Sequence, residues 1–302
     1  MSVSVKNVTK LYGQQRALSN VSFDIPTGQV VGFLGPNGAG KSTMMKIISC
    51  FIPQTEGTVT VSGFDTIAAS VSVRKNVGYL PEHNPLYTDM YVKEYLAFIG
   101  AIHMPAVNAA KRAAEMIEIT GLQLEYKKKI GALSKGYRQR VGLAQAMIHD
   151  PAVLILDEPT SGLDPNQLVE IRGLIKNIGK EKTVILSTHI MQEVEAICDR
   201  VIIINRGEIV ADDTTALLRD KIKPELVVIV EFDKPIDASL LKKVAHVSSV
   251  KNVSGNTWKV YHTGDVDIRK ALFNLAVSLD IAVLSMQKEE GRLEDIFQQL
   301  TQ

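Results

Sequence analysis

The amino-acid sequence predicts an α/β fold, and three observations support this prediction. A glycine-rich loop at residues 35–43 follows an apolar run and precedes apolar residues at helical spacing. Two further apolar runs, Val153–Leu156 and Val184–Leu186, lead directly into polar side chains. Uninterrupted apolar runs of this length are typical of strands that are buried on both faces. Because open α/β sheets bind ligands at the carboxyl ends of their strands, the polar residues after these runs are candidate site residues.

The loop has the phosphate-binding pattern G-x-x-x-x-G-K-[ST]. Its glycines let the backbone fold close around a phosphate and point N–H groups inward, where a Cβ would collide. Lys41 then reaches the β- and γ-phosphates of a nucleoside triphosphate, and the Ser42 hydroxyl can ligate Mg²⁺. Strand, loop and helix occur in the required order, so a chance glycine-rich turn is the weaker interpretation. The expected phosphate-binding residues are Gly35, Pro36, Asn37, Gly38, Ala39, Gly40, Lys41, Ser42 and Thr43.

Length and composition exclude several classes of protein. The 302 residues allow one or two domains with a sizeable core. Lysine and arginine number 34 against 33 acidic residues, so no overall field points to nucleic acid or an anionic membrane. Cys50 and Cys198 lie far apart without clustered histidines, which is typical of reduced cysteines in the cytosol. No apolar run approaches the roughly 18 residues of a membrane span, and the first residues are not a signal peptide.

Two stretches near the start, Ser2–Val8 and Ala17–Ile25, alternate apolar and polar residues as half-exposed strands do. We expect them to form an antiparallel edge layer. Tyr12 lies between them, and its ring can stack on a purine base. A tyrosine in a turn is more often structural, so both interpretations stay open at this point.

The middle of the chain continues this pattern of strands and then becomes helical. A strand and turn are predicted at Thr58–Asp65, and a buried strand at Val77–Leu80, which Pro81 ends. Glu82 is therefore expected at a strand end, where ligand-facing groups lie. From about residue 91 to residue 146 the apolar residues recur at helical spacing, which predicts a helical insertion. At its end, Ser134 is a candidate N-cap whose helix start can bind an anion, although an ordinary capped helix explains it as well.

The apolar run at Val153–Leu156 delivers two acids, Asp157 and Glu158, to a strand end. Buried carboxylates are costly unless they are paired or bind a metal. A Mg²⁺ ion held by Asp157, with Glu158 orienting or deprotonating a water, explains both residues better than a solvated turn. His189 follows the next apolar strand and is a candidate sensor of the γ-phosphate, although a lone histidine is more often structural. The turn Asn205–Gly207 connects the two strands of a predicted hairpin.

With these motifs in order, the first ~215 residues closely resemble the nucleotide-binding domain of ABC transporters. The resemblance implies a P-loop NTPase fold of ABC type, with a mixed sheet core, an antiparallel β layer and a helical subdomain at about 88–148. Residues 35–43 match Walker A, and the remaining matches run along the chain as follows: Tyr12 at the adenine-stacking aromatic, Glu82 at the Q-loop, Ser134, Lys135 and Gly136 in the signature motif, Asp157 at Walker B, Glu158 at the catalytic carboxylate, Asp164 in the D-loop, and His189 at the switch histidine.

The resemblance also implies a mechanism and partners. An ATPase that works as a head-to-tail homodimer is expected, in which the signature of one chain completes the ATP site of the other. Glu158, His189 and Glu82 are the expected catalytic residues, and the Mg²⁺ ligands are expected to be Ser42, Asp157 and Glu82. Integral-membrane permease subunits would contact the Glu82–Tyr87 region and hold the chain on the cytoplasmic face of the cell membrane. No nucleic-acid partner is expected.

Two motifs depart from the usual family pattern. The Q-loop carries Glu82 in place of glutamine, and the signature reads L-S-K-G-Y in place of L-S-G-G-Q. A second carboxylate beside the phosphates would repel the γ-phosphate unless it contacts Mg²⁺ directly or through water. Both substitutions resemble a subgroup of ATPases for multidrug or antibiotic export, and gliding-motility exporters in particular. The gliding-motility ATP-binding subunit is the predicted nearest relative.

The sequence predicts a domain boundary near residue 220, with the ATP-binding domain at 1–220 and an accessory domain at 221–302. Predicted strands and helices alternate in the order β-α-β-β-α-β, which is typical of a ferredoxin-like α+β module, and a last helix is expected at 293–300. The segment has no cluster of acids, histidines or cysteines, so docking, dimerisation or regulation is expected. Two alternatives to a transporter subunit stay open: a soluble ABC ATPase acting on ribosomes or nucleic acid, and a P-loop small-molecule kinase.

Overall fold

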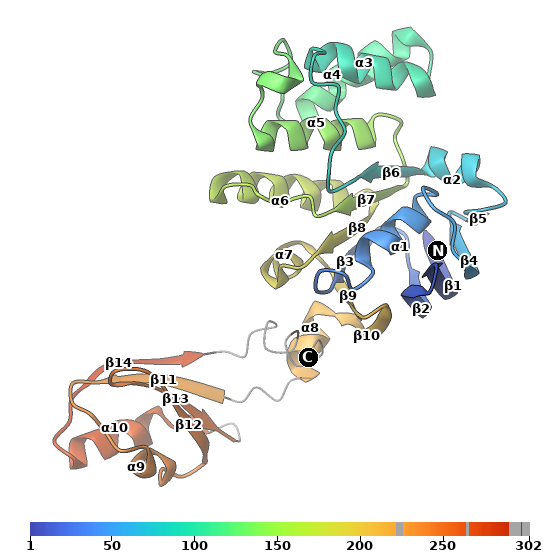
Figure 1. Cartoon of the computed structure of the whole chain (residues 1–302). Helices are drawn as coiled ribbons and strands as arrows, with labels where there is room; N and C mark the ends of the chain where they lie inside the picture. The colour runs from blue at the N-terminus through green and yellow to red at the C-terminus, as the bar shows by residue number, and fades with distance from the viewer. Residues whose placement is uncertain (222–225, 264–265, 290–296, 298–302) are drawn as a thin grey trace. The chain divides into compact units, whose positions relative to one another are not determined.

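The computed structural model describes residues 1–221, 226–263, 266–289 and 297. They form two compact units, residues 1–215 and a second unit that begins at Ala216 (Figure 1). Within the described ranges, no helix has the length and apolar character that crossing a membrane requires.

The first unit is built around a six-stranded sheet with the order β10-β9-β3-β8-β7-β6. β9, β3, β8, β7 and β6 are parallel to their neighbours, and only β10 runs antiparallel. Every residue of β3, β7 and β8 is buried, which confirms the prediction from the apolar runs. The strands are β3 (Val30–Leu34), β6 (Val77–Leu80), β7 (Val153–Asp157), β8 (Thr183–Thr188), β9 (Arg200–Asn205) and β10 (Glu208–Thr214).

An antiparallel sheet of order β2-β1-β4-β5 forms a second layer, as predicted. Its strands are β1 (Val3–Tyr12), β2 (Gln15–Ile25), β4 (Glu56–Val61) and β5 (Phe64–Asp65). Helix α1 (Lys41–Ile48) buries its methionines and isoleucines in one hydrophobic cluster with residues of both sheets. This cluster fixes the start of α1, and with it the preceding loop, against the end of β3.

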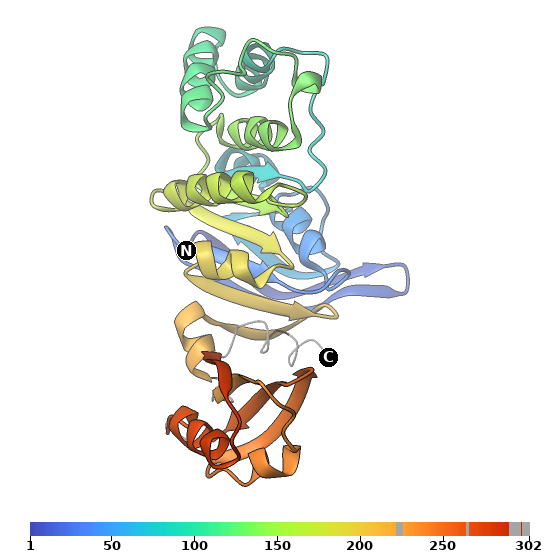
Figure 2. The ribbon, with the colours of Figure 1, turned by 90° about the vertical axis from the view of Figure 1, so that its left-hand side faces the viewer.

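Helices α6 (Pro165–Gly179) and α7 (Met191–Ile197) pack against β8, on the side of the sheet away from β1, β2 and β4 (Figure 1). Helix α2 (Ser70–Asn76) precedes β6. The predicted helical insertion consists of α3 (Val92–His103), α4 (Ala106–Ile119), the short 3₁₀ helix η1 (Ile130–Ala132) and α5 (Lys135–Met147). Figure 2 shows these teal and green helices together at one end of the unit, beyond the sheet.

A stacked histidine pair links the helical insertion to the sheet. The rings of His103, in α3, and His149, after α5, lie 4.4 Å apart and within 13° of parallel. Nε2 of His149 lies 3.0 Å from the Val77 carbonyl oxygen of β6, and its buried Nδ1 has no hydrogen-bond partner in the described structure. Burial lowers the pKa of His149 from its ordinary value of 6.5; the nearby His103 and Lys182 lower it further, while the Val77 carbonyl and Asp150 oppose this. Burial also lowers the pKa of His103.

The folded state therefore binds fewer protons at these two histidines than the unfolded chain does below about pH 6.5. We expect the free energy of unfolding to be constant near neutral pH and to fall as the pH drops below that value. Urea unfolding at a series of pH values measures this dependence. His149→Phe keeps an aromatic ring but cannot be protonated, so its curve should be flatter than that of the parent. An identical pH dependence in the variant would contradict this account.

Helix α8 (Thr215–Lys221) starts at the last residue before the boundary between the units, and the second unit contains the predicted order β-α-β-β-α-β. Its antiparallel sheet has the order β12-β13-β11-β14. Residues from this sheet and from the two helices that follow α8 share one hydrophobic cluster. Trp258 packs against that cluster and is therefore structural. The expected helix at 293–300 lies outside the described residues except for Phe297. The elements are β11 (Leu226–Phe232), α9 (Ala238–Lys242), β12 (Val247–Ser254), β13 (Thr257–His262), α10 (Arg269–Ser278) and β14 (Val283–Glu289).

Candidate functional site

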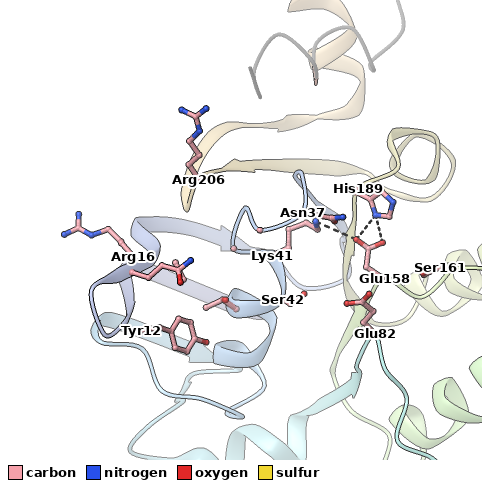
Figure 3. A pocket seen from close by; sticks show the side chains of 15 residues that line it. Tyr12, Arg16, Asn37, Lys41, Ser42, Glu82, Glu158, Ser161, His189 and Arg206 are labelled. Atoms are coloured by element: carbon pink, nitrogen blue, oxygen red, sulfur yellow. Dashed lines mark hydrogen bonds and ion pairs between the residues drawn. The ribbon is translucent and has the colours of Figure 1, made fainter.

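A cavity of about 790 Å³ opens over the loop between β3 and α1 (Figure 3). Its volume lies within the range of roughly 300–1,000 Å³ that is usual for small-molecule sites. It brings together residues from distant parts of the chain that the sequence proposed as one site. The lining residues are Tyr12, Gln15, Arg16, Ala17, Asn37, Gly38, Gly40, Lys41, Ser42, Thr43, Glu82, Glu158, Ser161, His189 and Arg206.

Two glycines of the loop are required by close backbone contacts. A Cβ on Gly35 would lie 2.4 Å from the Ile204 carbonyl oxygen, and Gly40 has a φ of 109°, where a Cβ would lie 2.7 Å from the Ala17 carbonyl oxygen. The loop is thus pressed against β2 and β9. Helix α1 begins directly after Gly40, so the free N–H groups of its first turn meet the cavity.

Lys41 is buried against the loop that precedes it. Its Nζ donates hydrogen bonds to the carbonyl oxygens of Gly35, at 2.8 Å, and Pro36, at 3.2 Å, and lies 3.7 Å from Oε1 of Glu158. Burial lowers the pKa of Lys41, while Glu158, Asp157 and Glu82 oppose this shift. The ammonium group is therefore held at the floor of the cavity, among carboxylates that favour its charged form.

Glu158 and His189, which directly follow β7 and β8, contact each other. Nδ1 of His189 lies 3.0 Å from each carboxylate oxygen of Glu158, and Figure 3 shows both side chains facing the loop. Burial raises the pKa of Glu158, although His189 and Lys41 oppose this shift. Glu158 also has a φ of 50°, a strained value for a residue with a side chain. A carboxylate with a raised pKa, oriented by a histidine, is suited to accept a proton from water.

Ser42 and Asp157 offer oxygen ligands for a hard cation. The Ser42 hydroxyl donates a hydrogen bond to Oδ1 of Asp157 at 3.2 Å, and the Ser187 hydroxyl donates a short hydrogen bond to the same oxygen. Glu82 lines the same cavity. The described residues contain no group of three or more His, Cys, Asp or Glu that could hold a metal alone. This donor set fits Mg²⁺, which binds through one or two carboxylates together with substrate phosphates.

Tyr12 ends β1 and lines the cavity at the side away from Glu158, with nearly half of its surface exposed (Figure 3). Lys10 lies over its ring, with Nζ 5.2 Å from the ring centroid. The exposed ring is available to stack on a base, which favours the functional interpretation of Tyr12 over a structural one.

Sequence reasoning missed the cations Arg16 and Arg206, which also line the cavity. Arg206 occupies the β9–β10 turn, and that turn is tied to the loop because the Gly207 N–H donates to the Ala39 carbonyl oxygen at 3.0 Å. The Ser19 N–H of β2 donates to the Gly207 carbonyl oxygen at 2.8 Å. Strand order brings these residues to the cavity. The only local signal was the position of the turn beyond the carboxyl end of an apolar strand.

Eight predicted residues do not line the cavity in the described structure. Four of them belong to the phosphate loop or contact it: Gly35, Pro36, Ala39 and Asp157. The other four lie at the starts of two helices: Ser134, Lys135, Gly136 and Asp164. Ser134 caps α5 by accepting a hydrogen bond from the Tyr137 N–H at 3.4 Å, and both Ser134 and Lys135 are exposed. A Cβ on Gly162 would lie 2.2 Å from Nζ of Lys135, so this ammonium group packs on the loop before α6. Asp164 caps α6 by accepting from the Gln167 N–H at 2.9 Å. Ser134 and Asp164 thus both serve as N-caps.

Comparison with known proteins identifies the family. A family model described as "ABC transporter" matches residues 18–161, and one for an AAA domain matches residues 129–195. The linearmycin resistance ATP-binding protein LnrL of Bacillus subtilis (strain 168) is 33% identical over 307 residues, which cover 99% of this chain and 98% of LnrL. The bacitracin transport ATP-binding protein BcrA of Bacillus licheniformis is 32% identical over 310 residues, which cover 99% of this chain and 98% of BcrA.

A solved structure supports the same conclusion. The dimeric structure of MJ0796, a bacterial ABC transporter cassette, aligns with a TM-score of 0.64 and 29% sequence identity over 70% of this chain and 98% of the cassette. The same cassette is also known in a post-hydrolysis dimeric state bound to ADP and Pi, with a TM-score of 0.64 and 30% identity. These matches confirm the ABC-type fold that the motifs predicted. The chain belongs to the family of ABC transporter ATP-binding proteins, and it is an ATPase subunit of such a transporter.

Proposed function

We propose that this subunit binds Mg²⁺-ATP in the cavity over the phosphate loop and powers an exporter. One observation supports the site most directly: Glu158 lies within contact distance of both His189 and Lys41, the first residue of α1. The site thus combines a cation that can bind the phosphates with a carboxylate that can accept a proton from water. Phosphoryl transfer depends on positioning and charge neutralisation more than on covalent catalysis, and this arrangement supplies both.

The predicted site residues have distinct roles in the proposed reaction. Tyr12 stacks on the adenine, while the loop N–H groups and Lys41 bind the β- and γ-phosphates. Glu158 orients the attacking water and accepts its proton, and His189 holds the carboxylate and senses the γ-phosphate. Ser42 and Asp157, with Glu82, would hold Mg²⁺, which would neutralise charge on the phosphates when bound.

We further propose that two identical chains associate head to tail. Ser134 and Lys135 are exposed and lie outside the cavity of their own chain, so they are available to a second chain's ATP. The start of α5 at Lys135 would then supply N–H groups for the γ-phosphate of the ATP that the second chain binds. ATP binding would close this dimer, and hydrolysis would open it.

The contact with membrane permease subunits is proposed at Glu82–Tyr87. Tyr87 is 57% exposed, and its ring lies 5.8 Å from that of Tyr95 and 6.1 Å from that of Phe98, which is itself 45% exposed. Two exposed aromatic rings, one of them on Tyr87 in the segment that follows Glu82, are suited to bind another protein and to transmit motion from Glu82. The chain would then lie peripherally on the cytoplasmic face of the membrane.

The similarity of this chain to linearmycin resistance and bacitracin transport proteins favours export of an antibiotic-like compound. A relationship to gliding-motility subunits stays a prediction.

A membrane pull-down tests this proposal. Tagged full-length Glu158→Gln protein is incubated with Mg-ATP and detergent-solubilised membranes, and the co-purifying proteins are identified. The same variant carrying Lys41→Ala, which should bind ATP much more weakly, is the matched control at an ATP concentration that saturates only the parent variant. We expect a polytopic membrane protein in stoichiometric amount. Ribosomal proteins or nucleic acid without a membrane partner would move the function to the soluble ABC ATPases. In a separate assay of the ATP reaction with the parent protein, a phosphorylated small molecule in place of free phosphate as the product would indicate a kinase.

A further inference from the structure

Glu193 is a fully buried carboxylate that does not line the cavity. It lies in the first turn of α7 and has no exposed surface. Among the described residues, no ion pair involves Glu193. A buried carboxylate without a counter-ion destabilises the folded state unless hydrogen bonds compensate for the lost hydration. The placement of Glu193 therefore needs a reason other than stability.

Two hydroxyl groups satisfy this carboxylate, one on each oxygen. The Thr160 hydroxyl donates a short hydrogen bond to Oε1, and the Thr188 hydroxyl donates to Oε2 at 2.6 Å. Both threonines are buried, with exposures of 2% and 0%. Thr188 Oγ1 also accepts from the Ile190 N–H at 3.1 Å, so its hydroxyl is oriented toward Glu193. Glu193 thus joins two chain segments that are distant in sequence.

These two segments carry the catalytic pair. Thr160 lies two residues after Glu158, and Thr188 directly precedes His189. A backbone hydrogen bond also joins the ends of β7 and β8: the Glu158 N–H donates to the Ser187 carbonyl oxygen at 3.1 Å. The Glu158 backbone is strained at a φ of 50°, and such a conformation persists only where the surroundings hold it. Glu193 holds the chain immediately beyond that strained residue.

We propose that Glu193 is a positioning residue for ATP hydrolysis. By accepting both threonine hydroxyls, it fixes the segment of Glu158 against the segment of His189 and so sets the 3.0 Å contact between them. Glu193 itself does not touch the substrate. A bidentate carboxylate suits this task because one rigid group fixes two partners at once. The inference rests on the proposed roles of Glu158 and His189.

The experiment compares purified full-length variants by steady-state ATP hydrolysis, equilibrium binding of ATP and thermal unfolding. Thr160→Val removes one hydroxyl from the network with almost no change in shape, and Thr160→Ser restores the hydroxyl. Glu193→Leu removes the carboxylate. Gln192→Ala changes the exposed neighbouring residue on the same helix and is the matched control.

Thr160→Val and Glu193→Leu should each lower kcat by about ten- to a hundred-fold, because small displacements of catalytic groups are this costly. KM and the dissociation constant for ATP should stay within about two-fold of the parent, since the phosphate loop is untouched. Thr160→Ser should regain most of the lost turnover. The double variant Thr160→Val/Glu193→Leu should have a kcat no lower than that of the single variants, because both changes break the same link between the two segments.

Three results would overturn the proposal. The first is a kcat of Thr160→Val close to that of the parent, and the second is a kcat of Thr160→Ser no higher than that of Thr160→Val. The third is a fall in kcat that is accompanied by a similar fold-loss of ATP affinity and by a lower unfolding temperature, which would indicate general destabilisation. If Glu193→Leu does not fold, the Thr160 pair alone decides. Glu158→Gln in the same assay separates the two proposals. An inactive Glu158→Gln beside an active Thr160→Val refutes only the role of Glu193, whereas an active Glu158→Gln refutes the proposed role of Glu158 itself.

Discussion

Replacing Glu158 with glutamine is expected to stop ATP turnover while ATP binding persists. Glutamine has nearly the same shape and can still contact His189, but its amide cannot accept a proton from water. General bases contribute roughly 10²–10⁴-fold to rates, and kcat should fall by about that factor. Binding should be retained or tightened, because the variant removes a negative charge 3.7 Å from Lys41 and beside the phosphates.

Phosphate release measures the turnover, and equilibrium titration with ATP measures the binding. Because hydrolysis would open the proposed dimer, the variant with Mg-ATP should elute as a dimer in size-exclusion chromatography, while the parent should not accumulate in that form. Glu181→Gln makes the same chemical change at an exposed position of the same unit and serves as the control. Normal turnover by Glu158→Gln would refute its role as the base, whatever the oligomeric state.

Local sequence patterns were sufficient to predict the central part of the site. β3, the loop and α1 follow one another without a break, and β7 is apolar up to Asp157, so neither prediction needed a contact with a distant segment. The antiparallel layer was predicted less fully. β1 continues to Tyr12, although the alternation of apolar and polar residues predicts a strand only as far as Val8. The register of β1 shifts between Val5 and Lys10, and Asn7 has a φ of 50°, so bulges interrupt the two-residue period that identifies a strand.

The residues that the sequence did not reveal reach the site through pairing of distant strands. Arg206 is near the phosphate loop because β9 lies beside β3 and because the turn after β9 is bonded to Ala39. Glu193 is near Thr160 because α7 packs on β8, which lies beside β7. In the sequence alone, a glutamate in a helix beside a second glutamate indicates a solvated face. Only the fold shows that one of the two is buried.

Replacing Lys41 with alanine is expected to weaken ATP binding itself. In the structure, this ammonium group is the cation at the floor of the cavity, and three carboxylates favour its charge. A hydrogen bond to a charged group contributes about 1.5–3 kcal/mol, so its loss should raise the dissociation constant of ATP by roughly ten- to a hundred-fold. The variant also leaves the carboxylates beside the phosphates without this cation, which adds repulsion in the same direction.

Isothermal titration with ATP and with ADP measures this effect, and thermal unfolding without nucleotide tests whether the loop stays folded. Lys46→Ala changes another lysine of α1 and is the matched control, because Lys46 does not line the cavity. The loss should be larger for ATP than for ADP, since Lys41 is proposed to contact the γ-phosphate as well as the β-phosphate. Unchanged ATP affinity in a folded variant would refute the assignment of residues 35–43 as the phosphate-binding loop. An equal loss for both nucleotides would restrict the contact of Lys41 to the β-phosphate and leave the γ-phosphate to His189 and to the partner's helix start.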